Sequence, residues 1–493
     1  MAGIKSLAKD SMIYGGSTIV TKFISWLMTP LFSYFILKSE FGMMTTIYAY
    51  GAVIIVVLTF GMETGFFRFV NQSPPEKKDS VYSTALLIVG SLIIAFLLVF
   101  LGFLRPIRFF LFDASIPDSY LRLILILACL DTFNSLPFAF LRYEKRPLRF
   151  GFYKVLQVTI YALLCVFFLV LCPKINNRHP EWISWFWKTD FRVGYILIAN
   201  LIATGIQALC LLLQMKRFRI SFDRQLAQQL FSYCFPLMLM GLAGMSNQVV
   251  DKIIFPAIYP DRELTFDQLG VYSACFKIGV IMIMFTQAFR YAFDPYVFEK
   301  KKDADAKQSY STVMKYFVAL GLLVFLAVVF YLDIFKYFVA SAYWSALKIV
   351  PIVLIGELFF AVYYNLSIWY KLTDKTYWGT IFSVLGFVII VVINVLFIPN
   401  YSYMACAWAS FAGNFFIMLI SYFIGQKYYP IKYDLKAIGL YAGLAMALFL
   451  VAESVVIENM WLRLLLRTVL LGVYAATALL LILRGRKVKP GNT

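Results

Sequence analysis

The sequence is poor in charged residues and contains a single histidine. Only 14% of its 493 residues are Asp, Glu, Lys or Arg, whereas about a quarter of the residues of a soluble domain are charged. The lone histidine, His179, can neither build a metal site nor complete a nucleophile–histidine triad. The composition therefore argues against an ordinary soluble enzyme domain.

Cysteine pairs and nucleotide-binding motifs are also missing. The seven cysteines lie mostly inside apolar segments and form no CxxC pair, so we predict neither a disulfide framework nor a metal site. The chain has no GxxxxGK[ST] phosphate loop, no HExxH and no GxSxG motif. We therefore predict no catalytic residues, no metal, no cofactor and no enzymatic activity, including ATP hydrolysis.

Long hydrophobic runs fill the chain instead, since 62% of the residues are hydrophobic. A membrane span needs about 20 mainly apolar residues. On that basis we predict an all-α polytopic membrane protein with about fourteen transmembrane helices. The predicted spans lie near residues 11–37, 41–67, 81–103, 119–141, 151–172, 192–214, 230–256, 268–292, 311–332, 346–370, 377–398, 403–425, 435–453 and 463–483.

The formal net charge of +19 comes from short basic clusters between apolar runs. Lysine and arginine are concentrated in alternate loops and at both termini, so these are predicted to be cytoplasmic. This distribution indicates contact with the phospholipid bilayer and argues against a nucleic-acid partner. The first apolar segment is too long for a cleavable signal peptide, so we expect it to be retained.

An internal repeat is visible at a shift of 228 residues, which places Gly42 on Gly270 and Gly51 on Gly279. A shift of 230 places Glu144-Lys145 on Asp374-Lys375. An even number of spans separates the equivalents, so the halves are predicted to be parallel repeats.

The repeat predicts two pseudo-twofold six-helix lobes followed by two C-terminal helices. The N-lobe would cover residues 1–214 and the C-lobe residues 230–425, joined by a cytoplasmic amphipathic linker at 215–229. Residues 426–493 would form the last two helices and a basic cytoplasmic tail.

Lys22 lies near the middle of the first predicted span. A cation in hydrocarbon is costly, so its side of the helix should face water or protein. Polar and small residues share that side at steps of three and four, namely Ser11, Gly15, Thr18, Ser25 and Thr29. This stripe predicts one wall of a hydrophilic cavity.

Further charged residues lie on the seventh and eighth predicted spans, where Asn247 and Asp251 share a face and Lys252 adjoins it. We predict that they line a central cavity for an anionic head group such as a phosphate. The alternative is a set of structural ion pairs, for instance Lys22 with Asp251. The predicted substrate-binding residues are Lys22, Asn247, Asp251, Lys252 and Lys277.

A second set of charged residues is assigned to coupling or gating. Asp131 and Glu357 fall at nearly equivalent repeat positions and could contact substrate, form structural pairs or serve as proton or cation sites. The others lie near the inner ends of spans, where an interfacial role is equally well supported. The full set is Asp131, Glu357, Glu63, Arg68, Arg290 and Asp294.

Three segments resemble polysaccharide flippases of the Wzx type, in the multidrug/oligosaccharidyl-lipid/polysaccharide exporter superfamily. They are GIKSLAKDSMIYGGSTIVTKFISWLMTPL, EFGMMTTIYAYGAVIIVVLTFGMETGFFRF and LGVYSACFKIGV. The resemblance implies a bacterial inner-membrane protein that exports undecaprenyl-diphosphate-linked oligosaccharide for O-antigen, capsule or exopolysaccharide, by alternating access. It also implies that cavity cations meet the diphosphate, and Lys22, Lys252 and Lys277 fit by location.

Other functions remain open from the sequence. A cation-coupled small-molecule or drug exporter of the same superfamily should prefer an acidic cavity. An integral membrane polysaccharide polymerase would need a large outer loop with catalytic residues, and a scaffold would leave the mid-membrane lysines unexplained. The partners we expect are the lipid-linked oligosaccharide and the bilayer, with a polysaccharide polymerase and glycosyltransferases as candidates.

Overall fold

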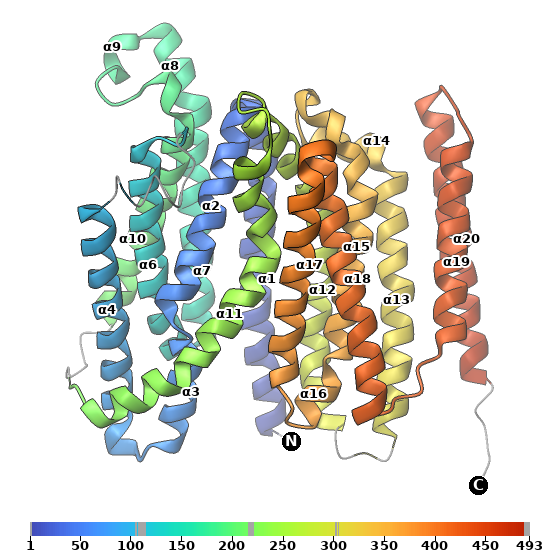
Figure 1. Ribbon diagram of the computed structural model, residues 1–493, viewed down its shortest axis with the longest axis horizontal. Coiled ribbons are helices and arrows are strands. Elements are labelled where there is room, and N and C mark those ends of the chain that lie inside the picture. The colour runs from blue at the N-terminus through green and yellow to red at the C-terminus, as the bar shows by residue number, and fades with distance from the viewer. Residues whose placement is uncertain are drawn as a thin grey trace. The chain divides into compact units, whose positions relative to one another are not determined.

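The computed structural model describes residues 2–103, 106, 115–214, 221–300, 303 and 305–487. It consists of two compact units (Figure 1). Unit 1 comprises Met1–Ser273 and Ile390–Tyr403, and unit 2 comprises Ala274–Ile389 and Met404–Thr493. The described residues form helices and connecting turns without any strand, so the predicted all-α class is confirmed.

The helices of unit 1 follow the predicted spans, with additional short helices in the connections. α12 and α17 each continue from one unit into the other. The unit 1 helices are α1 (Ala2–Phe35), α2 (Lys38–Thr59), α3 (Met62–Gln72), η1 (Pro75–Lys77), α4 (Lys78–Gly102), α6 (Asp118–Tyr143), α7 (Pro147–Val166), η2 (Phe167–Leu171), α8 (Cys172–Arg178), α9 (Pro180–Ile183), η3 (Thr189–Phe191), α10 (Arg192–Gln214), α11 (Arg224–Ile258) and the start of α12 (Thr265–Lys300).

Unit 2 contains the remaining helices. They are the rest of α12, α13 (Ala306–Phe330), α14 (Leu332–Phe335), η4 (Lys336–Phe338), η5 (Ser341–Ile349), α15 (Val350–Leu366), α16 (Ile368–Leu372), the first half of α17 (Tyr377–Tyr401, whose second half belongs to unit 1), α18 (Tyr403–Tyr428), α19 (Leu435–Ser454) and α20 (Met460–Lys487).

Thirteen helices among the described residues are long and apolar enough to cross a membrane. α1 is not among them, although it is 34 residues long. Lys22 and the polar stripe make it less apolar than the others. Counting it brings the number of long helices to the predicted fourteen, in agreement with the span count.

The second predicted span is broken into α2 and α3. Phe60 and Gly61 separate them with positive φ angles of 52° and 68°, a conformation that favours glycine. α11 packs against α3 at the break, where a Cβ on Gly65 would lie only 2.4 Å from Cys234 Sγ. Figure 1 shows α11 starting almost level beside α3 and then rising, and Pro236 lies within this helix. The sequence predicted one continuous span here.

The first residues of the predicted linker, 215–220, lie outside the described residues. Asp223 caps the N-terminus of α11 by accepting a hydrogen bond from the Leu226 N–H at 3.1 Å. Residues 224–229 are therefore the start of α11, which packs on α2 and α3 within unit 1. The lobe boundary drawn at this linker remains a prediction.

Equivalent contacts in the two units fit the predicted internal repeat. A Cβ on Gly51 of α2 would lie 2.9 Å from Ile124 of α6, and a Cβ on the equivalent Gly279 of α12 would lie 2.6 Å from Val353 of α15. In each unit, the glycine lets two spans approach closely.

The ends of α6 and α16 also correspond. Lys145 and Asp374 follow these helices with φ angles of 55° and 58°. The residue after each donates its backbone N–H to the carbonyl five residues earlier, at 3.0 and 2.9 Å. The structure thus aligns Lys145 with Asp374, one position away from the sequence match of Lys145 with Lys375.

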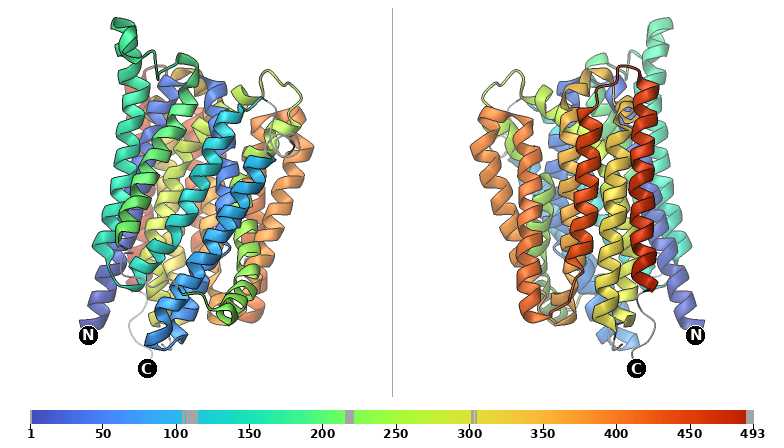
Figure 2. Two further views of the ribbon diagram at one scale, coloured as in Figure 1. Left: turned by 90° about the vertical axis from the view of Figure 1, so that its left-hand side faces the viewer. Right: turned by 90° about the vertical axis from the view of Figure 1, so that its right-hand side faces the viewer.

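The last two spans, α19 and α20, pack against α13 in unit 2 (Figure 2). Asp333 of α14 holds α20 through an ion pair with Arg463 at 2.8 Å and a hydrogen bond from Arg467 at 3.0 Å. Lys336 lies 3.6 Å from the same carboxylate. Tyr474 of α20 adds a buried hydrogen bond to a carbonyl of α13 at 3.1 Å. These spans, predicted to lie outside the repeat, are thus fastened to one unit.

We expect Asp333→Asn to loosen α20, because the substitution leaves two arginines without their shared carboxylate. Hydrogen bonds to charged groups contribute about 1.5–3 kcal/mol. Thermal unfolding in detergent should therefore begin at lower temperature, and the loop at 455–459 should become more sensitive to protease. The control is Glu458→Gln, an exposed acid in that loop. Equal stability of both variants would contradict the proposed role of Asp333.

Candidate functional site

An ion pair lies in the last third of α11. The Asp251 carboxylate is 3.0 Å from the Lys252 ammonium and accepts a hydrogen bond from the Tyr272 hydroxyl at 2.7 Å. Asp251 and Tyr272 are both buried. Lys252 also donates to the Gln248 carbonyl at 3.1 Å. Two adjacent residues that the sequence assigned to substrate thus bind one another.

α2 also contacts this pair, through a hydrogen bond from Thr46. The hydroxyl of Thr46, which is fully buried, donates to the backbone carbonyl of Lys252 at 3.2 Å. Asp251 therefore lies where α11, α2 and the start of α12 meet. A buried carboxylate with a cation and a phenol as donors is well satisfied. These contacts favour the structural interpretation for Asp251, with Lys252 and Tyr272 as its partners.

Lys22 lies on the exposed part of α1. The predicted polar stripe is divided, because Gly15 and Thr29 are buried while Lys22 and Ser25 are exposed. α1 packs on α7 through a neighbouring face, where a Cβ on Gly151 would lie 3.2 Å from Ser17. The packing of α1 on α7 therefore leaves the Lys22 side chain exposed.

Asp131 of α6 interacts electrostatically with Lys154 of α7. The Lys154 ammonium also lies 4.3 Å from the centre of the Phe138 ring. The sequence singled out Asp131 but missed Lys154. Its position inside the predicted span 151–172, where a charge is costly, was the available signal.

Glu63 and Arg68 both lie on α3 and have different partners. Glu63 forms an ion pair with Arg142 of α6, a residue that the sequence placed in a basic loop cluster. The Arg68 guanidinium lies 4.2 Å from the centre of the Tyr233 ring on α11. These contacts tie α3 to α6 and α11, which fits the interfacial and structural interpretation.

A network of uncharged polar side chains runs between α2, α7 and α10. Asn200 donates to the Tyr48 hydroxyl at 3.2 Å and accepts from Gln157 at 3.2 Å. Gln157 also lies 3.4 Å from the Thr204 hydroxyl. Gln207 accepts from Asn134 of α6 at 3.3 Å. Sequence reasoning missed this network, although the spacing of residues 200, 204 and 207 places them on one helix face.

In unit 2, Lys277 is exposed on α12 and Glu357 is half-buried on α15. The Arg290 guanidinium lies 3.6 Å from the centre of the Tyr364 ring, and the Lys371 ammonium lies 4.1 Å from the same ring. The side chain of Asp294 lies outside the described residues. The predicted association of Lys277 with the lysines of unit 1 stays a prediction.

The charged residues of the predicted site can bind a ligand electrostatically. No group of three His, Cys, Asp or Glu side chains among the described residues could hold a metal ion. Glu63 pairs across helices with Arg142, and Lys22 and Lys277 are exposed on α1 and α12. Exposed ammonium groups can bind an anion as point charges.

The sequence matches the model of a family described as "Polysaccharide biosynthesis protein" over residues 7–301. No curated protein matches it.

Solved structures of two kinds share the fold. The lipid II flippase MurJ in an inward closed conformation superposes with a TM-score of 0.70 at 12% identity, covering 94% of this chain and 98% of that chain. A multidrug resistance MATE family transporter of the MOP superfamily in an inward-facing conformation superposes with a TM-score of 0.58 at 13% identity. The match covers 86% of this chain and 93% of that chain. A MATE family transporter in an outward-facing conformation superposes with a TM-score of 0.54 at 14% identity. The match covers 85% of this chain and 95% of that chain. The chain is a multi-pass membrane protein with this fold.

Proposed function

This chain belongs to the polysaccharide biosynthesis protein family, and from that premise we propose that it is a flippase for lipid-linked oligosaccharides. Its substrate would be an undecaprenyl-diphosphate-linked oligosaccharide unit used for O-antigen, capsule or exopolysaccharide. It would work by alternating access in the bacterial inner membrane, with both termini in the cytoplasm.

The exposure of Lys277 is the observation that carries this proposal. Lys277 lies within the candidate span Thr265–Tyr291 and is exposed. An ammonium group at that depth is costly against lipid, so we propose that its exposed side faces water. Lys22, exposed on α1, supports the same interpretation. A water-filled, cationic space inside the membrane suits a diphosphate with attached sugars.

The polar head group and the lipid tail would follow different routes. The diphosphate would bind Lys22 and Lys277, with sugars meeting polar side chains such as Asn247, while the tail stays in the bilayer. The Asp251–Lys252 pair would hold α11 on α2 and α12 in the conformation described here. Release outward would require these charges to exchange their partners.

Asp131 and Glu357 are the residues we propose for coupling to an ion or proton. The interaction of Asp131 with Lys154 provides a site where a proton or cation could compete with a built-in ammonium group. Glu357, at the nearly equivalent repeat position, would serve the other unit. The supply of substrate would depend on glycosyltransferases, and its use on a polysaccharide polymerase.

The test is the surface polysaccharide made by a deletion strain that expresses Lys22→Ala, Lys277→Ala or both. We expect polymer output to fall about tenfold or more for each variant, because a hydrogen bond to a charged group contributes about 1.5–3 kcal/mol. Lipid-linked oligosaccharide should accumulate on the cytoplasmic leaflet. Lys22→Arg and Lys277→Arg, which retain the charge, should keep much of the activity.

Membrane levels of each variant provide the control. Normal polymer output from the Lys22→Ala and Lys277→Ala double variant, at normal protein levels, would overturn the cationic-site proposal. If the deletion strain instead gains drug sensitivity and keeps its polysaccharide, the protein is an exporter of small molecules.

A further inference from the structure

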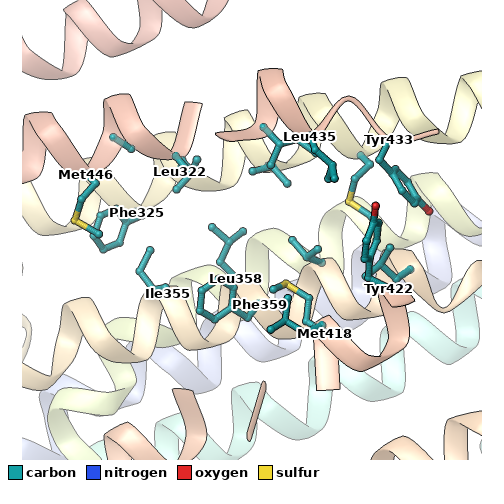
Figure 3. Close-up of a pocket in the computed structure, with 18 of the residues that line it drawn as sticks. Leu322, Phe325, Ile355, Leu358, Phe359, Met418, Tyr422, Tyr433, Leu435 and Met446 are labelled. Carbon is teal, nitrogen blue, oxygen red and sulfur yellow. The ribbon is translucent and has the colours of Figure 1, made fainter. Parts of the chain in front are cut away.

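Unit 2 contains an apolar groove between four of its membrane-length helices, with a volume of about 490 Å³ (Figure 3). Met446 and Phe325 lie at one end, and Tyr422 and Tyr433 lie at the other. α13 and α15 supply much of the lining, including Leu322 and Leu358. α18 and α19 supply most of the remainder.

The groove exists because of small residues on one face of α19. This helix packs on α13 and α20. Toward α15 and α18 it presents Ala442 and Ala445 between the larger Ile438 and Met446. Ala442 is exposed, so a larger side chain at this position would enter the space. Alanines at positions 442 and 445 thus leave the groove open, whereas leucines at these positions would fill it.

The apolar lining suits a hydrocarbon chain better than water or a polar ligand. Side chains of leucine, methionine, phenylalanine, valine and alanine dominate it, and ordered water needs several polar partners. All four helices are candidate membrane spans, so the groove lies at the depth of lipid chains. A group the size of water, close to that of a methylene, occupies about 30 Å³. The groove is therefore many times larger than one such group and has room for a segment of a fatty-acyl chain.

The end of the groove at Tyr433 carries excess positive charge. Lys432 and Lys436 flank Tyr433 and Leu435, and both are exposed. Asp434 lies between them but is 3.2 Å from Lys315 of α13 and also caps α19. The two exposed lysines are placed where the head group of a lipid in the groove would lie. Basic pockets of this kind between membrane helices bind anionic head groups.

We propose that this groove binds an anionic phospholipid, with one acyl chain between α19 and the helices α13, α15 and α18 and with its phosphate at Lys432 and Lys436. The bound lipid fills the space that α19 leaves open and so fastens α19 to the rest of unit 2. The occupant is a resident lipid of the bilayer, distinct from the transported molecule. The inference therefore does not depend on the proposed function.

The first experiment measures lipid bound to the purified full-length protein by native mass spectrometry. The protein is stripped of lipid and then offered phosphatidylglycerol and phosphatidylethanolamine in mixed micelles. We expect the wild type to retain one phosphatidylglycerol in preference to phosphatidylethanolamine. Ala442→Phe, whose ring would occupy the groove, should retain about tenfold less. Ala447→Phe is the matched control, since Ala447 is exposed on the same helix and does not line the groove.

The second experiment tests the head-group site. The Lys432→Gln and Lys436→Gln double variant should lose the preference for phosphatidylglycerol while still retaining a lipid. Lys77→Gln, an exposed lysine of unit 1, should leave both properties unchanged. This double variant alters only exposed positions, so it tests the proposal even if Ala442→Phe fails to fold. Ala442→Leu provides a smaller substitution in that event.

Three results would overturn the proposal. One is equal lipid retention by Ala442→Phe and Ala447→Phe. Another is a wild-type protein that retains no phospholipid under these conditions. The third is displacement of phosphatidylglycerol by a prenyl diphosphate added at equal concentration, which would identify the groove as part of the substrate route.

Discussion

Replacing Gly270 by alanine is expected to lower the thermal stability of the protein strongly. A Cβ at this position would lie 2.0 Å from the Lys38 carbonyl oxygen and 3.1 Å from the Gly42 nitrogen. The obstructing atoms are backbone, so no flexible side chain can move aside. Overpacking of a well-packed site costs about 1–3 kcal/mol, and we expect the upper end of that range.

Gly42 should behave in the same way, because a Cβ there would lie 2.1 Å from the Phe266 carbonyl oxygen. The two glycines are equivalents in the internal repeat and lie against each other where α2 meets the start of α12. The measurement is the unfolding midpoint of Gly42→Ala and Gly270→Ala in detergent.

Matched controls are available at helical glycines with open surroundings. A Cβ on Gly90 of α4 or on Gly472 of α20 would meet nothing within 4 Å. Gly→Ala at these sites should be neutral or should stabilise the helix by about 0.5–1 kcal/mol. If Gly270→Ala unfolds at the same temperature as Gly90→Ala, the result would contradict the close backbone contact between α2 and α12.

Removing one member of the Asp251–Lys252 pair is the second large effect that we expect. Asp251→Ala leaves the Lys252 ammonium and the buried Tyr272 hydroxyl without their acceptor. Breaking a buried pair by removing one partner costs about 3–5 kcal/mol. We expect lower membrane levels, a lower unfolding midpoint and, in consequence, less surface polysaccharide.

The double variant Asp251→Asn with Lys252→Gln separates structure from substrate binding. It removes both charges together and keeps a polar acceptor for Tyr272, so protein levels should recover relative to Asp251→Ala. Recovery of polymer output as well would assign the pair a structural role. Recovery of protein levels without polymer output would show that the two charges are needed for transport itself, either in contact with the substrate or in the exchange of partners proposed for release.

Much of the fold is predictable from the sequence because a membrane span is a local property. Twenty apolar residues form a helix in a bilayer regardless of their neighbours. The break in the second span was not predictable in this way. Phe60 adopts a positive φ beside Gly61 because α3 packs under α11, and that contact joins residues far apart in the chain.

The candidate site was likewise predictable only in part: its charged residues could be identified from the sequence, but their partners could not. Lys22, Asp131, Asp251 and Lys277 were found from the sequence because a charge inside an apolar run is costly wherever it lies. Their partners were not. A pair with Lys22 was the example given for a structural role of Asp251, and the structure shows Asp251 bound to Lys252 and Tyr272. Lys154 was missed although it lies inside a predicted span, and Arg142 was assigned to a cytoplasmic loop because it follows the predicted span 119–141.

The sequence by itself determined that the chain is an all-helical membrane protein and which residues place charge inside its apolar runs, and it predicted an internal repeat. These features depend on the transfer of side chains into hydrocarbon and on matches along the chain. Only the tertiary structure decided which charges neutralise one another and which remain exposed. It also showed that Gly42 and Gly270, matched first as repeat equivalents, touch backbone to backbone. Pairing and exposure depend on distances of a few ångströms between helices, which no pattern along a single helix specifies.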